Sequence, residues 1–340
     1  GDALGLRGGE DTPGAGESEV FAEAVSFHSC RHREQHYAAG GAGAGAAVGG
    51  GAVFYWVGGR LMANIKLFVC CHQPEEVPKH PLLVPIQVGA ALADSHFPGF
   101  LYDDTGENIS AKNRSYCELT AQYWAWKNAD ADYYGFFHYR RYLYPDIRAK
   151  RPYRIEKKAD ISLLSRLGYE GFLDLIRRYD LILPMGENMY LPVREHYAKA
   201  RFHHREDLEL TEEIVREVSS EYEPALEQYL SGTVCYFGNI FIMKKTIFQE
   251  YCSWLFSILE EFDRRANTGS YGPQEMRVDG YLGERLLGTF YLHQRDRLDV
   301  LELPRVQFVS YWKERYLKTG MNIFFPAGSF RRSLIKKMKR

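Results

Sequence analysis

The chain has 340 residues, enough for one large domain or two small ones with a substantial core. Its 43 lysine and arginine residues nearly cancel its 44 aspartate and glutamate residues, so the formal net charge is −1. This balance excludes a general electrostatic attraction to nucleic acid, and any electrostatic function must come from local clusters of charge.

Residues 1–61 differ from the rest of the chain because they contain a Gly/Ala-rich tract without helical or strand periodicity. Its apolar part is too short and too rich in glycine to span a bilayer, and no basic segment precedes it as in a signal peptide. We predict a disordered leader over 1–61, with a functional tail as the minority alternative. The first methionine is Met62, so this leader is also a candidate for sequence outside the native protein.

The segment Ile65–Cys71 is a continuous apolar run of strand length, typical of a buried parallel strand. A proline-rich loop, a second candidate element over 85–94 and a polar turn over 102–108 follow it. Ser115 and Glu118 then form a capping-box pattern, which predicts that a helix opens at Tyr116 and runs to Lys127.

The segment Tyr133–Phe137 predicts another buried strand, and His138, Arg140 and Arg141 follow it directly. Adjacent residues on a strand point to opposite faces, so at most one of the two arginines should point into a site. Asp130 and Asp132 have the spacing of an acidic metal motif, but they precede the strand, and we interpret them as a helix-to-strand turn.

The later elements continue the alternation of strands and helices. We predict strands over 179–183 and 234–243, a helix capped by Thr211, an amphipathic helix over 247–262, a helix beginning near Gly280, and a return to the sheet over 289–293. This order predicts an α/β fold with a single, mostly parallel central sheet flanked by helices. The domain should cover 62–310, and a basic carboxyl tail should cover 311–340.

Six cysteines show no CxxC spacing, so neither a disulfide framework nor a zinc site is supported. We predict buried thiols in a reducing cytoplasm.

Three polar clusters lie at or within apolar strands: His72 after the first strand, His138 with Arg140 and Arg141 after the next, and Asn239 inside the segment 234–243. Ends of strands that meet at one sheet edge can build a single site, although they are far apart in sequence. Because histidine and arginine supply donors and positive charge, we predict that these five residues bind a diphosphate.

Four separated blocks carry a resemblance to a known family: NISAKNRSYCELTAQYWAWKN, GFFHYRRY, GNIFIMKKTIFQEYCSWLF and DGYLGERLL. They resemble, over about residues 65–295, a bacterial family first catalogued as a domain of unknown function. That family occurs among capsular and exopolysaccharide biosynthesis proteins and is regarded as glycosyltransferases with a GT-A-like fold.

The resemblance implies a nucleotide-sugar-binding domain that transfers sugar from an activated donor. GT-A-like folds often hold the nucleotide base and ribose in the loop that here contains four further candidate donor-binding residues, Asp104, Asn108, Lys112 and Asn113. Many GT-A enzymes bind a divalent ion through an Asp-x-Asp motif, which is replaced here by His138-Tyr139-Arg140. No metal ligands are therefore assigned, and dependence on Mn or Mg stays open.

A carboxylate base would activate the acceptor hydroxyl in an inverting enzyme. We predict Glu284 for this role, beside Arg285, with Asp279 as the competitor. His196, His203 and Asp207 lie on a segment expected at the acceptor side.

The sequence thus predicts a hexosyltransferase that uses a nucleotide sugar, with uridine diphosphate as the expected carrier, and a lipid-linked glycan acceptor in capsule or exopolysaccharide synthesis. Two alternatives are a non-catalytic carbohydrate-binding protein and a nucleotide-sugar processing enzyme. The tail RRSLIKKMKR suits an anionic membrane surface, which predicts a cytoplasmic protein at the periphery of the inner membrane.

Overall fold

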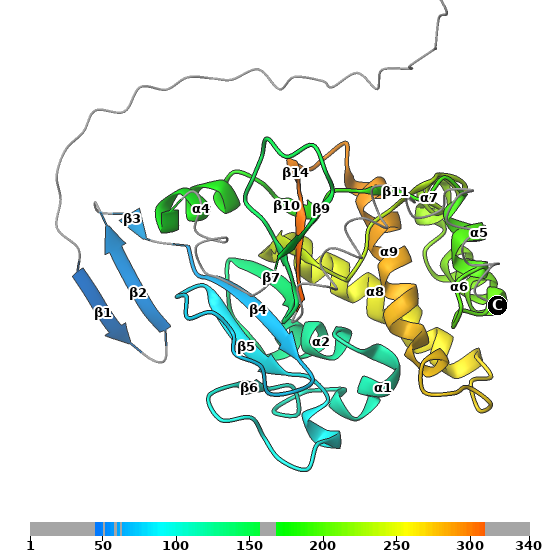
Figure 1. The fold of residues 1–340 in the computed structure, drawn as a ribbon, viewed down its shortest axis with the longest axis horizontal. Helices are drawn as coiled ribbons and strands as arrows, with labels where there is room; N and C mark the ends of the chain where they lie inside the picture. The colour runs from blue at the N-terminus through cyan, green and yellow to red at the C-terminus, as the bar shows by residue number, and fades with distance from the viewer. Residues whose placement is uncertain (1–44, 50–51, 58–59, 62, 157–167, 310–340) are drawn as a thin grey trace, which may run out of the picture.

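A computed structural model describes residues 45–49, 52–57, 60–61, 63–156 and 168–309 (Figure 1). The strands are β1 Gly45–Gly49, β2 Ala52–Val57, β3 Arg60–Leu61, β4 Ile65–Cys71, β5 Leu83–Gln87, β6 Leu101–Tyr102, β7 Tyr133–His138, β8 Arg141–Leu143, β9 Tyr153–Glu156, β10 Leu181–Pro184, β11 Glu187–Asn188, β12 Val234–Cys235, β13 Phe241–Lys244, β14 Val300–Leu303 and β15 Arg305–Phe308. The helices are α1 Asn113–Tyr116, α2 Leu119–Asn128, α4 Gly168–Arg177, α5 Val193–Ala198, α6 Arg205–Val218, α7 Glu223–Ser231, α8 Lys245–Arg265 and α9 Val278–Gln294, with 3-10 turns η1 Ala90–Leu92, η2 Ser110–Lys112, η3 Ser220–Tyr222 and η4 Glu275–Arg277.

The central sheet has the strand order β14-β10-β13-β7-β4-β5-β6, and β8, β9 and β15 extend it from β7. β7, β4, β5 and β6 are parallel neighbours, and β10 is parallel to β14. β13 runs antiparallel to both β7 and β10. The predicted α/β fold with a mostly parallel sheet flanked by helices is confirmed.

The predicted leader and tail are described only in part. Residues 1–44 and 310–340 lie outside the described residues, so the basic tail is not described. Within the predicted leader, β1, β2 and β3 form a separate antiparallel sheet of three strands. The described part of this segment is therefore strand rather than irregular chain.

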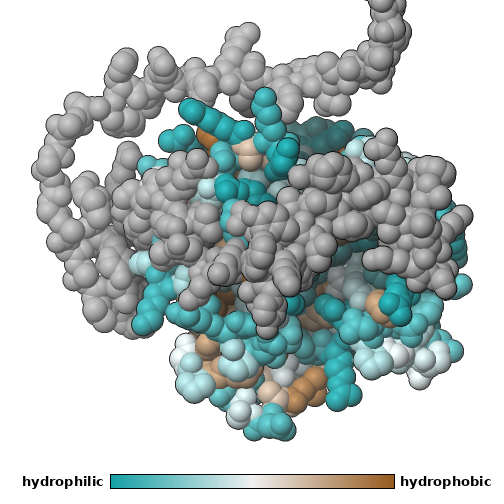
Figure 2. Space-filling model, in the orientation of Figure 1, coloured by the Kyte–Doolittle hydropathy of each residue, from teal (hydrophilic) through white to brown (hydrophobic). Residues whose placement is uncertain are grey.

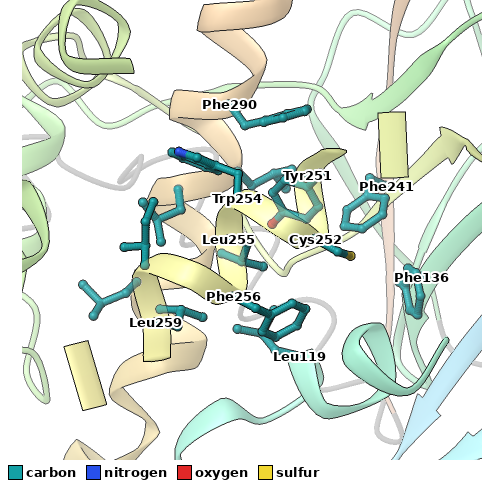
Figure 3. Close-up of a cluster of buried hydrophobic side chains, with 14 of the residues drawn as sticks. Leu119, Phe136, Phe241, Tyr251, Cys252, Trp254, Leu255, Phe256, Leu259 and Phe290 are labelled. Atoms are coloured by element: carbon teal, nitrogen blue, oxygen red, sulfur yellow. The ribbon is translucent and has the colours of Figure 1, made fainter. Parts of the chain in front are cut away.

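Alternating residues of the central strands pack into two cores, one on each face of the sheet. Phe68, Phe136 and Phe241 point to the face covered by α2, α8 and α9. Figure 3 shows this core, in which Tyr251 and Trp254 of α8 meet Phe290 of α9. The opposite face buries Leu67, Val69 and Ile242 against residues of α4 and β15. Burial on both faces explains why β4 is apolar along most of its length.

Buried cysteines belong to these cores. Cys70, Cys71, Cys235 and Cys252 are buried free thiols, and Cys117 is half-buried. Burial raises the pKa of Cys235 to about 11, which keeps its thiol protonated at neutral pH. The predicted buried thiols are confirmed for these four residues, whereas Cys30 lies outside the described residues.

The predicted capping box at Ser115 and Glu118 is wrong. The chain forms a short α1 and a separate α2, and they are divided at Cys117, which has φ 52°. The Ser115 hydroxyl is hydrogen-bonded to Asp279, and the Glu118 carboxylate to Asn239. Both side chains of the pattern therefore bond to distant elements instead of capping a local helix.

Two other predictions about helices are also wrong. Thr211 lies inside α6, which begins at Arg205, and its hydroxyl donates to the Asp207 carbonyl one turn earlier. Residues 289–293 do not return to the sheet, because they complete α9 and bury Phe290 against α8. By contrast, the amphipathic helix predicted over 247–262 is confirmed as α8.

We expect Gly288→Ala to destabilise the contact between α7 and α9. A Cβ at Gly288 would lie 2.2 Å from the ring of Tyr229, which is buried and bonded to the Tyr236 amide. Overpacking of this kind costs about 1–3 kcal/mol, from which up to about 1 kcal/mol of helix propensity is recovered. Denaturant unfolding would measure the loss, with Gly269→Ala as the control because nothing lies closer than 3.8 Å to its Cβ position. Equal stability of the two variants would contradict the expectation.

Among the described residues, no helix combines the length and the apolar character needed to cross a bilayer. On the face drawn in Figure 2, hydrophilic side chains predominate, and apolar groups gather near the end where β6 and α1 lie in Figure 1.

Candidate functional site

The three predicted polar clusters meet at one edge of the central sheet. Cys70 of β4 pairs with His138 at the end of β7, and the ring centroids of His72 and His138 are 6.1 Å apart. Because β13 is antiparallel to β7, with Phe241 opposite Phe136, the turn before β13 brings Asn239 to the same edge. The predicted convergence of His72, His138 and Asn239 follows from this topology.

The two arginines after β7 are separated by a tight reversal of the chain. Arg141 begins β8 and pairs with His138, while Arg140 lies exposed at the turn with its guanidinium 4.9 Å from the Tyr139 ring. β8 pairs with β15, which adds Arg305 to the same edge. Arg141 is half-buried and Arg140 is exposed, as expected for adjacent residues that point in different directions.

Burial and positive charge keep both histidines of this edge neutral. Burial lowers the pKa of His138 to about 2, and Arg141 and Arg140 add to the shift. Burial also lowers the pKa of His72, followed by the charges of Arg140 and Arg277. The Arg140 amide donates to His138 Nδ1 at 3.2 Å, so in the neutral ring Nε2 carries the proton and can donate to a bound molecule.

Arg141 is a half-buried cation without a paired carboxylate among the described residues. Burial lowers its pKa, and the neighbouring charge of Arg305 lowers it further. No carboxylate of the described residues forms an ion pair with Arg141, whereas Arg305 pairs with Glu187 at 2.5 Å. A half-buried guanidinium without a paired anion is a favourable place for a bound anion.

Two carboxylates face this cationic group, because Glu284 and Glu118 both oppose the effect of burial on the pKa of Arg141. Glu284 Oε2 accepts a hydrogen bond from Arg285 Nη1 at 2.9 Å, and its Oε1 accepts one from the Gly238 amide at 2.6 Å. Glu118 Oε1 accepts a hydrogen bond from Asn239 at 2.9 Å. The edge therefore brings two carboxylates, Glu118 and Glu284, close to the cationic Arg141 and the two histidines.

Asp279, the competing catalytic candidate, is fully buried in the first turn of α9. It accepts a hydrogen bond from the Ser115 hydroxyl. Burial raises the pKa of Asp279 to about 7, and the charge of Asp263 adds to the shift. Asp279 therefore links α1 to α9 and is not accessible to solvent. The Glu284 side chain, by contrast, is 18% exposed.

The four residues predicted to bind base and ribose lie in a loop that is bonded mainly to itself. Asp104 accepts from His96 at 2.8 Å, and Asn108 bonds to the Asp104 and Gly106 carbonyls. Lys112 pairs with Asp263 at 2.7 Å, and Asn113 bonds to the Cys117 carbonyl and Thr120. None of these hydrogen bonds and ion pairs reaches His72 or His138, so the loop is not bonded to the two histidines.

The residues predicted for the acceptor side gather around α9. His203 stacks on Tyr281 with centroids 4.1 Å apart, and burial lowers its pKa to about 3, with a further contribution from Arg285. Asp207 is buried and accepts from the Tyr271 hydroxyl at 2.8 Å. The His196 ring lies 5.9 Å from Phe237. Tyr281 lies near both this group and the site edge, because the charges of Arg277, Glu284 and Glu118 all shift its pKa.

The sequence reasoning missed four residues at this edge: Glu118, Glu187, Arg277 and Arg305. Glu118 belongs to the Ser-x-x-Glu pattern that we interpreted as a helix cap. Arg277 precedes α9, and Arg305 arrives through the pairing of β15 with β8, which no local pattern encodes.

Within the described parts of the chain, no group of three or more histidine, cysteine, aspartate or glutamate side chains could hold a metal ion. Asp130 pairs with Lys245 at 2.6 Å, and Asp132 accepts from the Asn64 amide at 2.7 Å. Both lie before β7, at the opposite edge from the histidines, which confirms the interpretation as a helix-to-strand turn.

The fold and this edge define an α/β protein that resembles a glycosyltransferase domain. Residues 66–295 match the family model described as "Domain of unknown function (DUF4422)", and the chain belongs to that family.

A solved structure titled as the apo form of the bifunctional glycosyltransferase WbbM is 32% identical, with a TM-score of 0.68. The match covers 72% of this chain and 45% of that chain, so this chain corresponds to less than half of WbbM. No curated protein matches.

Proposed function

We propose that this protein is a glycosyltransferase that moves a hexose from a nucleotide sugar, with uridine diphosphate as the carrier, to a lipid-linked glycan. The likeness to WbbM, a bifunctional glycosyltransferase, supports the reaction class. Sugar transfer requires neutralisation of the leaving diphosphate, and the arginines and neutral histidines at the sheet edge suit that requirement.

The observation that carries the proposal is Arg141, half-buried and without an ion-pair partner among the described residues. A diphosphate at this point would contact the half-buried Arg141 directly, and the exposed Arg140 would add positive charge from the turn beside it. His138 Nε2 and His72 would add hydrogen-bond donors. Asp104, Asn108, Lys112 and Asn113 would contact the base and ribose, in the loop beside this edge.

A carboxylate of the edge would take the proton of the acceptor hydroxyl. Glu284 stays the residue predicted from the sequence, and Asp279 the alternative. The acceptor would enter along the group around Tyr281, where His196, His203 and Asp207 lie. A lipid-linked acceptor, a place in capsule or exopolysaccharide synthesis and peripheral binding to the inner membrane belong to the same proposal.

Release of uridine diphosphate from a panel of UDP-hexoses tests the reaction, and thermal shift with the same panel tests binding. A glycosyltransferase should be stabilised by one donor and should release its diphosphate slowly to water. Stabilisation by free sugars without diphosphate release would favour a carbohydrate-binding protein instead. Parallel assays with EDTA, Mn and Mg would establish whether an ion takes part.

Arg141→Ala should weaken binding of uridine diphosphate by about 1.5–3 kcal/mol, roughly 10- to 150-fold, because it removes a charge-assisted hydrogen bond, and Arg140→Ala should weaken it less, because Arg140 is exposed and its charge is screened by solvent. Binding of uridine should change little, since uridine lacks the diphosphate. Calorimetry would compare the two ligands, with the exposed Arg264→Ala as control. If both ligands lost affinity equally, the arginines would lie outside the diphosphate site.

A further inference from the structure

Glu118 lies at the junction between α1 and α2, bonded to Asn239 of the site edge. Its negative charge raises the pKa of Cys70 in β4, of Arg141 in β8 and of Arg277 before α9. Its carboxylate is half-buried and bonded to Asn239. Elements from four parts of the chain thus surround one carboxylate.

The backbone is strained on both sides of this carboxylate. Cys117, directly before Glu118, has φ 52°, and its partner Asn239 has φ 50°. They are two of the three non-glycine residues with positive φ in the part of the chain that the structure describes. Side chains disfavour this conformation, and such strain is concentrated at functional sites.

Cys117 divides α1 from α2 and so frees Glu118 from helix capping. Gly238, with φ 96°, directs its amide to Glu284 while Asn239 directs its amide group to Glu118. The same short turn therefore positions both glutamates of the edge.

The two glutamates differ in how their oxygens are occupied. Both oxygens of Glu284 already accept hydrogen bonds, one from buried Arg285 and one from Gly238, so fewer of its lone pairs are free to take a proton from an acceptor. Glu118 accepts a hydrogen bond from Asn239 and one from its own backbone, and among the described residues no cation forms an ion pair with it. Asp279 is fully buried against Ser115.

We propose that Glu118 is the catalytic base, with Asn239 as its positioning residue and Glu284 as a fixed neighbouring charge. This inference rests on the proposed function. The acceptor oxygen forms a bond to the anomeric carbon, and the bond from that carbon to the diphosphate breaks. The diphosphate leaves with the electron pair, and the acceptor proton passes to the Glu118 carboxylate. In donor hydrolysis, water takes the place of the acceptor hydroxyl.

Burial supports this role by raising the pKa of Glu118, and the charge of Glu284 adds to the increase. A backbone hydrogen bond, the hydrogen bond from Asn239 and the charge of Arg277 lower the pKa of Glu118 in the opposite direction. A carboxylate with raised proton affinity is a more effective general base than an exposed one. Asn239 also donates to the Gly280 carbonyl at 3.0 Å, which holds its amide in place relative to α9.

The test measures release of uridine diphosphate from the UDP-hexose that the full-length protein hydrolyses. Glu118→Gln keeps the shape and an acceptor for Asn239, but it removes basicity. Its kcat should fall on the order of 10²–10⁴-fold, the usual contribution of general base catalysis, while the Kd for uridine diphosphate changes less than about threefold. Glu209→Gln, an exposed carboxylate on α6, is the matched control and should match the wild type.

A kcat of Glu118→Gln within about threefold of the wild type would overturn the assignment and leave the proposed function intact. Absence of diphosphate release by the wild type from every nucleotide sugar would instead overturn the proposed function. If Glu118→Gln does not fold, Glu118→Ala with added formate decides the question. Formate-dependent recovery of release supports the base, and no recovery overturns it.

Asn239 requires a variant that separates positioning from backbone strain. Asn239→Gly removes the amide but adopts positive φ without cost, so the turn that holds Glu284 is preserved. We expect a lower kcat and a shifted acid limb of the pH profile, with an unchanged Kd for uridine diphosphate. An unchanged kcat and pH profile would overturn the positioning role.

Discussion

Arg285→Ala is expected to lower the free energy of unfolding by about 3–5 kcal/mol, the usual cost of removing one partner from a buried ion pair. Arg285 is 2% exposed, and its guanidinium lies 5.4 Å from the Tyr197 ring and 5.6 Å from the Phe237 ring. The variant would leave Glu284 without its cation and would open a space between these rings.

Chemical denaturation of the variant and the wild type would measure this loss. Arg205→Ala is the matched control, because Arg205 pairs with Glu195 on the surface and should have little effect on stability. Replacement of both partners, in Glu284→Gln with Arg285→Met, should be less harmful than Arg285→Ala, since no unpaired charge then stays buried. Equal stability of Arg285→Ala and Arg205→Ala would show that the buried pair contributes little.

The fold was predictable where one physical signal dominated. A long apolar run such as Ile65–Cys71 has few alternatives to a strand buried on both faces. The apolar face of α8 repeats at helical spacing over many turns. The segment 289–293 was misassigned because aromatic residues have high strand propensity, whereas packing of Phe290 against α8 determines its state.

The residues that meet at the candidate site were predictable only in part. His72, His138 and the adjacent arginines follow strands directly, so the general rule for sheet edges located them. Glu118 was hidden by an equally good local explanation, because Ser-x-x-Glu also describes a helix cap. Whether Glu118 caps a helix or faces the site depends on the positive φ of Cys117. Cysteine has no preference for this conformation, so the sequence does not predict it. Arg305 depends on a long-range strand pairing that the sequence does not encode locally.

Asp103→Asn is expected to destabilise the fold by about 2–4 kcal/mol, although it changes a single atom type. Asp103 is fully buried and accepts four hydrogen bonds from three segments of the chain. Its Oδ2 accepts from the Gly89 amide at 2.8 Å and the Thr120 hydroxyl at 2.6 Å. Its Oδ1 accepts from the Ala90 amide at 2.9 Å and the Ser110 hydroxyl at 2.5 Å. This carboxylate joins the start of η1 to η2 and α2.

Asparagine cannot satisfy this arrangement in either orientation of its amide. One orientation places the NH₂ group against the Gly89 amide and the other places it against the Ala90 amide, so a buried N–H always faces another donor. The hydroxyls of Ser110 and Thr120 can rotate to accept, but a backbone N–H cannot. The cost therefore combines an unsatisfied buried donor with the loss of charge-assisted bonds.

Thermal and denaturant unfolding of Asp103→Asn would measure this cost, with Asp94→Asn as control because Asp94 is exposed in the same loop. The loop that Asp103 anchors continues into Asp104 and Asn108, the predicted contacts to base and ribose. We therefore expect weaker binding of uridine as well as of uridine diphosphate, unlike the effect of Arg141→Ala. Wild-type stability in Asp103→Asn would mean that the two amides find other acceptors, and the buried carboxylate would then not be what holds this loop.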